Sequence, residues 1–417
     1  MGYYIVEGGR KIGGAYTVHG SKNAVLPILA ATLLAADEVV LENCPLISDF
    51  FASLEILQNL GCKVILEGNT VTIDSKNIVS CEIAEKQVSC MRSSILYLGA
   101  LLGRKKEAKL GHPGGCVIGK RPIDLHLRAF EKMGVEIREE KGIFSCQSPK
   151  LLGYDIYLEF PSVGATENIL LLAVKAEGTT VIHNAAREPE IIWLSRFLRA
   201  CGAEIYGEGS PTIMIEGVRK LHGAYFAIPF DRIEAGTFLC ASAITGGELY
   251  LYGAEKQYME STLDILKIMG CGLRTEEEGI FLQAPKRLLS DFSLRTGPYP
   301  AFPTDMQPLM MSLLTLGKGT CMISETVFEA RFRHVDALRK MGADIRMQGQ
   351  NAAVFGVRKL YGTEVFGKDL RGTAALLLAA LAAEGESTVH GAEYMERGYE
   401  KIEDALTVLG SKVRLIS

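Results

Sequence analysis

The sequence lacks the features that mark a membrane protein or a secreted protein. Its longest apolar stretches, such as the run from Leu376 to Ala383, are far shorter than the ~20 residues that a membrane-spanning helix requires. The first residues, MGYYIVEGG, contain neither the basic region nor the apolar region of a signal peptide. We therefore expect a cytoplasmic protein that does not enter a membrane.

Strong charge of one sign is also missing. The formal net charge is −4 over 417 residues, and no basic stripe with interleaved aromatic residues is present. This balance argues against general binding to nucleic acid or to an anionic membrane, which normally needs a basic surface. With 48% apolar and 23% charged residues, the chain has an ordinary globular composition and enough length for two or more cores.

Paired cysteines and clustered metal ligands are absent as well. The ten cysteines occur singly, and the seven histidines form neither an HExxH motif nor a cluster with cysteine. Several cysteines, such as Cys201 and Cys240, stand where other parts of the chain have Ala or Leu, so we interpret most of them as buried thiols. The sequence predicts no disulfide, no metal and no cofactor.

The sequence does contain a regularly repeated glycine, which ends a helix-like run each time. Six helix-like runs end in Gly61, Gly134, Gly202, Gly270, Gly342 and Gly410, which are 73, 68, 68, 72 and 68 residues apart. Strand-like sequence such as KVILEGNTVTI follows each glycine. A glycine just past a helix is a C-cap signal, because only glycine enters the left-handed conformation without steric cost. The chain is therefore predicted to contain six repeats.

Each repeat carries two helix-like segments ahead of its glycine. The first is almost wholly apolar, as in ILAATLLAA, and a helix that is apolar on all sides is buried on all sides. The second is amphipathic, as in VDALRKMG. The predicted fold is an inside-out α/β barrel of two domains, built from six repeats with buried helices and surrounding sheets.

The last repeat stops before its final strand. The segment from Ile5, IVEGGRKIGGAYTV, resembles the strand-like segments IMIEGVRKLHGAYF and VFGVRKLYGTEVF of other repeats, so it can supply the missing strand. We predict one domain of about residues 22–229, and a second of about residues 230–417 closed by residues 1–21. The chain would then cross between the domains twice.

The turns that enter the buried helices are polar. Ser, Thr and Asp in these turns are N-cap candidates, worth roughly 1 kcal/mol each. Cations there oppose the helix dipole, and they favour a bound anion such as a phosphate or carboxylate. If such helix ends face one another across a cleft, they imply a multiply charged anionic substrate. Pairing within Asp231-Arg232 and Asp369-Leu370-Arg371 is the competing explanation. The cations at these turns are Lys22, Arg92, Arg232 and Arg371.

One repeat has an irregular insertion, GHPGGCVIGKRPIDLHL. Its glycines and prolines are typical of a mobile loop, and long loops of this kind are often lids. Cys116 lies at its tip beside Lys120 and Arg121, where positive charge could lower the pKa of an exposed thiol. Because a cysteine between glycines has no apolar packing role, we take Cys116 as a catalytic candidate.

The second predicted domain carries further candidates. In PAFPTDMQP, two prolines fix the turn around Asp305, a good setting for a rigid carboxylate base. ETVFEARF contains Glu329 and Arg331, and YMERGYE places Arg397 at the start of an expected surface helix. Taken alone, either arginine could be a solvated surface charge.

These segments resemble the signatures of a known family along the whole chain. HGSKNAVLPIL, MRSS, PGGCVIGKRPIDLH, SVGAT, NAAREPEI, DRIEAGTF, PAFPTDMQ, ETVFEARF, DLRGT and RGYEKIED are similar, in order, to those of the UDP-N-acetylglucosamine 1-carboxyvinyltransferases. The resemblance implies two similar domains that close over UDP-N-acetylglucosamine and phosphoenolpyruvate. It also implies transfer of the enolpyruvyl group to the sugar 3-hydroxyl with release of phosphate, the step that opens peptidoglycan synthesis, with no metal required.

The resemblance also implies residue roles. Cys116 matches the acid that protonates the methylene carbon of phosphoenolpyruvate and the thiol that the antibiotic fosfomycin alkylates, while Asp305 matches the base that takes the hydroxyl proton. Lys22, Arg121 and Arg397 match residues that hold phosphoenolpyruvate, and Arg331 and Arg371 match cleft-closing or phosphate-facing groups. Positions that match nucleotide-sugar contacts are Asn23, Arg92, Pro122, Ile123, Asp124, Leu125, Ser162, Val163 and Val327.

The chain departs from the family pattern in a few places. Phe160-Pro161 stands before SVGAT where a basic residue is common, which puts one contact to the uridine diphosphate in doubt. His112 precedes the loop where Leu is common, and we expect this change to alter the mobility of the loop.

Three alternatives stay open on the sequence. A shikimate-pathway enolpyruvyl transferase shares the repeat but lacks an equivalent cysteine loop. An RNA-processing or RNA-binding protein is disfavoured by the charge balance. A weak paralogue with a binding or regulatory role is disfavoured by the presence of Cys116 and Asp305.

Overall fold

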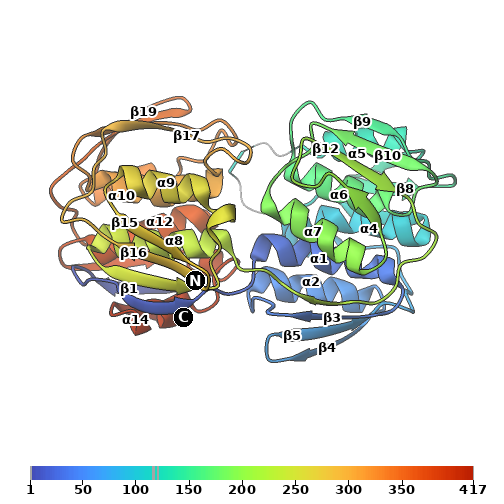
Figure 1. Cartoon of the computed structure of the whole chain (residues 1–417), viewed down its shortest axis with the longest axis horizontal. Coiled ribbons are helices and arrows are strands. Elements are labelled where there is room, and N and C mark those ends of the chain that lie inside the picture. The colour runs from blue at the N-terminus through green and yellow to red at the C-terminus, as the bar shows by residue number, and fades with distance from the viewer. Residues whose placement is uncertain (1, 115–117, 120–121, 417) are drawn as a thin grey trace. The chain divides into compact units, whose positions relative to one another are not determined.

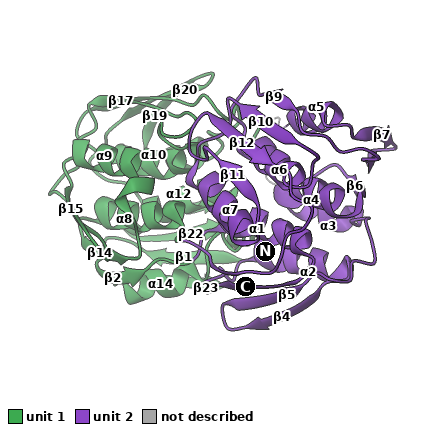
Figure 2. Ribbon diagram, turned by 45° about the vertical axis from the view of Figure 1, so that its right-hand side comes forward, with its two compact units in different colours: residues 1–19, 117–120, 230–417 green, residues 20–116, 121–229 purple. Residues whose placement is uncertain are grey.

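The computed structural model describes residues 2–114, 118–119 and 122–416, and within them the chain forms two compact units (Figures 1 and 2). Unit 1 comprises residues 1–19, 117–120 and 230–417, and unit 2 comprises residues 20–116 and 121–229. Cys116, Lys120 and Arg121 lie outside the described residues. The chain passes from one unit to the other between residues 19 and 20 and again between residues 229 and 230, and the described residues 118–119 also group with unit 1.

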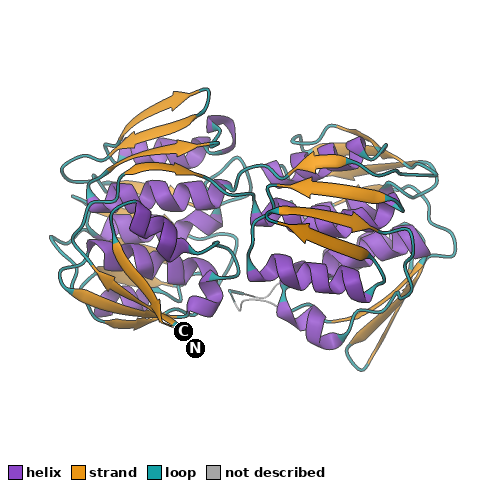
Figure 3. Cartoon of the chain, turned by 90° about the horizontal axis from the view of Figure 1, so that it is seen from below, coloured by secondary structure: helices purple, strands orange, loops and turns teal. Residues whose placement is uncertain are grey.

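The interior of each unit is made of helices that have almost no exposed side chains. Each of these helices is apolar around its whole circumference, so burial on every side is the arrangement that removes most apolar surface from water. Figure 3 shows the helices inside each unit with strands outside them. The six buried helices are α1 (Lys22–Ala35), α4 (Leu96–Lys105), α6 (Val163–Ala173), α8 (Arg232–Thr245), α10 (Gln307–Thr315) and α12 (Leu370–Ala382).

A second, amphipathic helix in each repeat runs towards the glycine punctuation. These helices are α2 (Ser48–Asn59), α5 (Asp124–Lys132), α7 (Pro189–Ala200), α9 (Glu260–Ile268), α11 (Val335–Lys340) and α14 (Ile402–Val408). Shorter helical segments are α3 (Glu85–Cys90), α13 (Ala392–Met395), and the 3-10 turns η1 (Arg92–Ile95), η2 (Lys256–Tyr258) and η3 (Thr304–Met306). Within the described ranges, none of the helices combines the length and the apolar character required to cross a lipid bilayer.

All six punctuating glycines adopt the left-handed backbone conformation that the sequence predicts. Their φ angles lie between 91° at Gly134 and 103° at Gly61 and Gly410. A strand follows each glycine, and in the first five repeats this strand forms an antiparallel hairpin with the next one. The prediction of six repeats capped by glycine is confirmed.

Unit 2 contains three sheets. Their strand orders are β13-β3-β5-β4, β6-β8-β7 and β11-β12-β10-β9. The middle sheet has three strands, and only an isolated parallel bridge between Glu82 and Lys109 stands where the others have a fourth strand. The strands are β3 (Glu38–Glu42), β4 (Lys63–Glu67), β5 (Thr70–Asp74), β6 (Glu107–Gly111), β7 (Glu136–Glu140), β8 (Ile143–Gln147), β9 (Asp155–Tyr157), β10 (Thr179–His183), β11 (Glu204–Tyr206), β12 (Thr212–Glu216) and β13 (Tyr225–Ala227).

Unit 1 contains three four-stranded sheets. Their orders are β15-β16-β14-β2, β17-β18-β20-β19 and β21-β22-β1-β23. The strands are β1 (Tyr3–Glu7), β2 (Gly14–Thr17), β14 (Glu248–Tyr252), β15 (Gly272–Glu276), β16 (Gly279–Gln283), β17 (Phe292–Arg295), β18 (Thr320–Ser324), β19 (Asp344–Gln348), β20 (Asn351–Phe355), β21 (Glu364–Phe366), β22 (Glu386–His390) and β23 (Lys412–Ile416).

The N-terminal strand completes the last repeat. β1 lies between β22 and β23 and pairs antiparallel with both, with Ile5 opposite Thr388 on one side and Arg414 on the other. Its inward side chains Tyr4 and Val6 are almost fully buried. The strand therefore fills the position that the truncated sixth repeat leaves vacant.

Replacing two of the punctuating glycines by alanine should cost different amounts of stability. Both Gly134 and Gly202 have left-handed φ angles, of 91° and 97°, which cost an L-residue roughly 1–2 kcal/mol. A Cβ at Gly134 would lie 2.4 Å from the Lys150 carbonyl oxygen, whereas at Gly202 it would meet only the movable His222 ring at 3.1 Å. We expect Gly134→Ala to lower the thermal unfolding temperature of unit 2 more than Gly202→Ala does. Equal shifts in calorimetry would contradict this explanation.

Candidate active site

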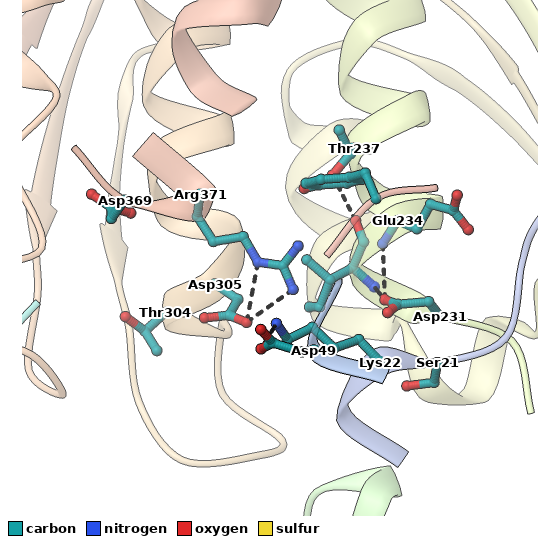
Figure 4. Close-up of polar contacts among 12 residues, drawn as sticks. Ser21, Lys22, Asp49, Asp231, Glu234, Thr237, Thr304, Asp305, Asp369 and Arg371 are labelled. Atoms are coloured by element: carbon teal, nitrogen blue, oxygen red, sulfur yellow. Dashed lines mark hydrogen bonds and ion pairs between the residues drawn. The ribbon is translucent and has the colours of Figure 1, made fainter. Parts of the chain in front are cut away.

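Asp305 in unit 1 forms ion pairs with two arginines, and Figure 4 shows it beside one of them, Arg371. It lies in η3, directly before the buried helix α10. Its Oδ1 accepts a hydrogen bond from Arg331 Nη2 at 2.6 Å, and its Oδ2 accepts from Nε and Nη2 of Arg371, both at 3.3 Å. Both arginines are almost fully buried, whereas the Asp305 side chain is 28% exposed. The structure therefore brings together three of the predicted site residues.

The arginines determine the protonation state of Asp305. Burial raises the pKa of the Asp305 carboxyl, but the charges of Arg371, Arg331 and Arg232 outweigh it and hold the pKa well below its usual range. Asp305 is thus an ionised hydrogen-bond acceptor at any ordinary pH. It is also a weak base, because the same charges that keep it ionised oppose its protonation.

Arg371 is held from two sides. Its guanidinium lies over the Tyr399 ring, 5.3 Å from the centroid, and the Tyr399 hydroxyl is 2.9 Å from Thr237 Oγ1. The competing sequence explanation, pairing of Arg371 with Asp369, is wrong for this residue. Asp369 Oδ1 instead accepts the Gly372 N–H as the N-cap of α12, which leaves Arg371 directed at Asp305.

Lys22 in unit 2 forms a buried ion pair that the sequence did not predict. Its Nζ donates to Asp49 Oδ2 at 2.6 Å, and the two residues are 9% and 5% exposed (Figure 4). Asp49 lies in the first turn of α2, where an acidic residue also interacts favourably with the helix dipole. That dipole preference is the only local signal, so sequence reasoning had no means of choosing Asp49 as the partner of Lys22.

Most of the polar residues at the entrances of the buried helices act as N-caps, but not all of them do. Ser21, Ser162, Asp231 and Asp369 accept hydrogen bonds from backbone N–H groups of the first helical turn, as predicted. Thr304 is an exception, because its hydroxyl donates to Glu325. Ser162 and Val163 are only half-buried, so the N-terminus of α6 remains accessible to an anion. Asn23 is half-buried in the first turn of α1.

Two cavities in unit 2 collect five predicted nucleotide-sugar residues. The first, of 330 Å³, has Arg92, Pro122, Ile123 and Asp124 in its wall, and the Arg92 Nη1 donates to the Pro113 carbonyl at 3.3 Å. The second, of 370 Å³, includes Leu125. Both hollows are open to solvent, so they are candidate contact surfaces for part of a larger ligand.

The remaining candidates lie in loops. Val327 is half-buried, and its N–H donates to Glu325 Oε1 at 2.9 Å. Arg397 is half-buried, but it does not begin a surface helix as expected. It follows the short helix α13, and α14 begins only at Ile402, because Lys401 takes a left-handed backbone with a φ of 41°.

The cysteine loop is described only in part. Cys116 and Arg121 lie outside the described residues. Between them in the sequence, the Ile118 carbonyl accepts a hydrogen bond from the Ala330 N–H at 3.0 Å within unit 1. Of the nine cysteines with described positions, seven are buried, as predicted for structural thiols, and Cys90 is exposed.

Removing Asp49 should destabilise unit 2 strongly. Asp49→Ala leaves the buried Lys22 ammonium without this carboxylate, and loss of one partner of a buried ion pair costs about 3–5 kcal/mol. Glu82→Ala, which breaks the exposed pair with Lys109 in the same unit, should cost less than about 1 kcal/mol. Denaturant unfolding of the two variants measures the difference. Similar stability losses would show that the Lys22–Asp49 pair is not a structural necessity.

Known proteins resemble the chain over almost all its length. The family model for EPSP synthase (3-phosphoshikimate 1-carboxyvinyltransferase) matches residues 6–406. The UDP-N-acetylglucosamine 1-carboxyvinyltransferase 2 of Caldanaerobacter subterraneus subsp. tengcongensis is 46% identical over 413 residues, which cover 99% of each chain. The UDP-N-acetylglucosamine 1-carboxyvinyltransferase of Nitratidesulfovibrio vulgaris is 45% identical over 414 residues, again covering 99% of each.

Solved structures share the two-domain fold. The enolpyruvyl transferase NikO from Streptomyces tendae superimposes with a TM-score of 0.91 at 25% identity, over 99% of this chain and 98% of NikO. EPSP synthase from Acinetobacter baumannii gives a TM-score of 0.78 at 21% identity, over the full length of both chains. The predicted inside-out α/β fold is therefore confirmed. The chain belongs to the EPSP synthase family of carboxyvinyl transferases, and within it to the UDP-N-acetylglucosamine 1-carboxyvinyltransferases.

Proposed function

We propose that the protein transfers the enolpyruvyl group of phosphoenolpyruvate to the 3-hydroxyl of UDP-N-acetylglucosamine and releases phosphate. The observation that carries this proposal is the 45–46% identity, along 99% of the chain, to proteins named for that activity. A shikimate substrate is the second candidate, and the name of the family model supports it. We favour the nucleotide sugar because the relatives with this high identity are named for it.

Three proton transfers define the chemistry. Protonation of the methylene carbon of phosphoenolpyruvate makes the adjacent carbon electrophilic, and the sugar hydroxyl adds to that carbon to give a tetrahedral ketal. We assign the first proton to Cys116 from the sequence match alone, because Cys116 lies outside the described residues. Return of a methyl proton to the Cys116 thiolate that the first transfer leaves, together with departure of phosphate, then completes the transfer.

Asp305 is the proposed acceptor of the hydroxyl proton. Its depressed pKa makes it a weak base towards a free alcohol. Attack on the electrophilic carbon acidifies the hydroxyl, however, so a weak base suffices at that moment. Arg331 and Arg371 keep Asp305 ionised and fixed, and they supply positive charge close to the departing phosphate if that group lies beside Asp305.

The remaining residues are proposed to hold the two substrates. Lys22, Arg121 and Arg397 would bind the phosphate and carboxylate of phosphoenolpyruvate, as charge-assisted hydrogen bonds to anions are strong. The accessible N-terminus of α6 at Ser162 and Val163 suits the diphosphate. The cavity residues Arg92, Pro122, Ile123 and Asp124, together with Leu125, Asn23 and Val327, would contact the rest of the nucleotide sugar.

The proposed reaction has a biological setting. Its product is a precursor of peptidoglycan, so the enzyme would act in the cytoplasm and support cell shape and division. Phe160, 42% exposed before the N-terminus of α6, replaces the basic residue common in the family, so backbone N–H groups would carry more of the diphosphate binding. A paralogue with a binding role remains the alternative, and turnover decides between the two.

Phosphate release should require both substrates and Cys116. Wild-type protein should release phosphate from phosphoenolpyruvate only when UDP-N-acetylglucosamine is present, and Cys116→Ala should abolish that release. Cys90→Ala is the matched control, because Cys90 is an exposed thiol on α3 with no proposed catalytic role. Mass spectrometry after incubation with fosfomycin and the nucleotide sugar should show one adduct, absent in Cys116→Ala. Release driven by shikimate 3-phosphate alone would overturn the proposal.

Neutralising Asp305 should slow the reaction without removing substrate binding. Asp305→Asn keeps the shape of the side chain but cannot accept the hydroxyl proton, so kcat should fall by roughly 10²–10⁴-fold. In the wild type, Asp305 stays ionised, so it should contribute no acid limb to kcat/KM between about pH 5 and pH 8. An acid limb in that range that disappears in Asp305→Asn would contradict the role of the arginines.

A further inference from the structure

Each buried helix is followed by a strand, and the residue directly after that strand occupies an equivalent position in every repeat. At this position the repeat that contains Asp305 differs from most of the others. In four repeats this position has a left-handed backbone and is Asn or Gly: Asn43, Asn184, Gly253 and Gly391 have φ angles of 54°, 55°, 79° and 103°. In the repeat that contains Asp305 the position is Glu325, which follows β18 and has no left-handed backbone. The remaining repeat has His112 at this position, after β6, and it too has no left-handed backbone. Glu325 is therefore not explained by the turn that four of the repeats need.

The asparagines show what this position does elsewhere. Asn43 Nδ2 donates to the Ile228 carbonyl, which precedes α8, and Asn184 Nδ2 donates to the Leu158 carbonyl, which precedes α6, both at 2.8 Å. In each case the side chain ties the end of a strand to the chain that enters a buried helix. The position is thus suited to hold a helix entrance in place.

At the entrance of α10, Glu325 accepts hydrogen bonds, whereas the two asparagines at the equivalent position donate them. Its carboxylate accepts from Thr304 Oγ1 at 3.1 Å, from the Val327 N–H at 2.9 Å and from the Phe328 N–H at 3.1 Å. Glu325 is only 1% exposed. A carboxylate is the side chain that can accept from all three donors at once, because it has two oxygens and carries no proton of its own.

These contacts close a ring around Asp305. Thr304 directly precedes Asp305, and its carbonyl accepts from Arg331 Nε at 3.1 Å, while Arg331 Nη2 binds Asp305 Oδ1 at 2.6 Å. Arg331 in turn follows the 327–328 segment that Glu325 holds, and its N–H donates to the Phe328 carbonyl at 3.3 Å. Glu325 therefore connects both sides of the Asp305–Arg331 pair without touching either side chain.

We propose that Glu325 is a positioning residue for the enolpyruvyl transfer. Through Thr304 it fixes the turn that carries Asp305, and through the two N–H groups it fixes the loop that carries Val327 and Arg331. The inference rests on the proposed function, in which Asp305 accepts the hydroxyl proton. Misplacement of a catalytic group by about 1 Å can cost on the order of 10²-fold in rate, so indirect support of this kind has a measurable effect.

Two pairs of variants test the proposal. Glu325→Ala and Thr304→Val each break the link, so each should lower kcat on the order of 10²-fold, with a much smaller change in KM for phosphoenolpyruvate. Glu325→Gln keeps an oxygen for the two N–H groups and an amide that can donate to the Thr304 hydroxyl, and Thr304→Ser keeps the hydroxyl. Both conservative variants should retain kcat within about fivefold of the wild type. The double variant Glu325→Ala/Thr304→Val should be little worse than Glu325→Ala alone, because the two changes remove one shared interaction.

A stability control separates positioning from folding. Ser312 Oγ donates to the Ala375 carbonyl at 2.7 Å and lies in the same helix α10, so Ser312→Ala removes a buried hydrogen bond away from the entrance. It should lower the unfolding temperature but leave kcat unchanged. If Ser312→Ala loses as much kcat as Glu325→Ala at an equal loss of stability, or if Glu325→Ala keeps kcat within about threefold of wild type, the proposal is overturned.

Hydrogen exchange provides a readout that does not depend on turnover. Glu325→Ala should increase amide exchange in the 326–331 segment, whereas Thr304→Val should leave the Val327 and Phe328 amides protected. Unchanged exchange in Glu325→Ala would overturn the positioning role. A wild-type protein without nucleotide-sugar-dependent phosphate release would instead overturn the proposed function, and the exchange result would still stand.

Discussion

Burial of six helices that are apolar on every side is the constraint on which the rest of the structure depends. Such a helix satisfies its backbone internally along its length, but the N–H groups of its first turn need partners at its entrance. Polar side chains therefore concentrate at these entrances, as Ser21, Ser162, Asp231 and Asp369 show. Four of the six buried helices thus have a polar cap at the entrance, and the proposed catalytic residue Asp305 lies at the entrance of another, α10.

The entrance of α10 is the clearest case. Asp305 has two nearly buried arginines on its carboxylate, and burying those guanidinium groups without an anion would be costly. The same charges lower the pKa of Asp305, so the arrangement that the fold needs for charge balance also sets the protonation state of the proposed base. Stability and chemistry are therefore coupled at this residue, and neither partner can be changed without affecting the other.

The Glu325 position illustrates how a repeat acquires a specialised element. In the asparagine repeats the side chain at this position supports a helix entrance through one backbone carbonyl. In the Asp305 repeat it accepts from three donors, and the left-handed backbone of the asparagine repeats is absent. The side chain still contacts the entrance of a buried helix, here through Thr304. As an acceptor it also binds two N–H groups of the loop that carries Arg331.

Local pattern in the sequence determined the repeats, the buried helices and the glycine caps, because each depends on residues within one or two helical turns of each other. It also identified Lys22, Asp305, Arg331 and Arg371 as candidates. Their partners were decided by the tertiary structure alone, since Lys22 pairs with a residue 27 positions away and Asp305 with residues 26 and 66 positions away. No local periodicity encodes such contacts. The packing of the helices selected them, and it holds the pKa of Asp305 low and places Glu325 beside the turn that carries it.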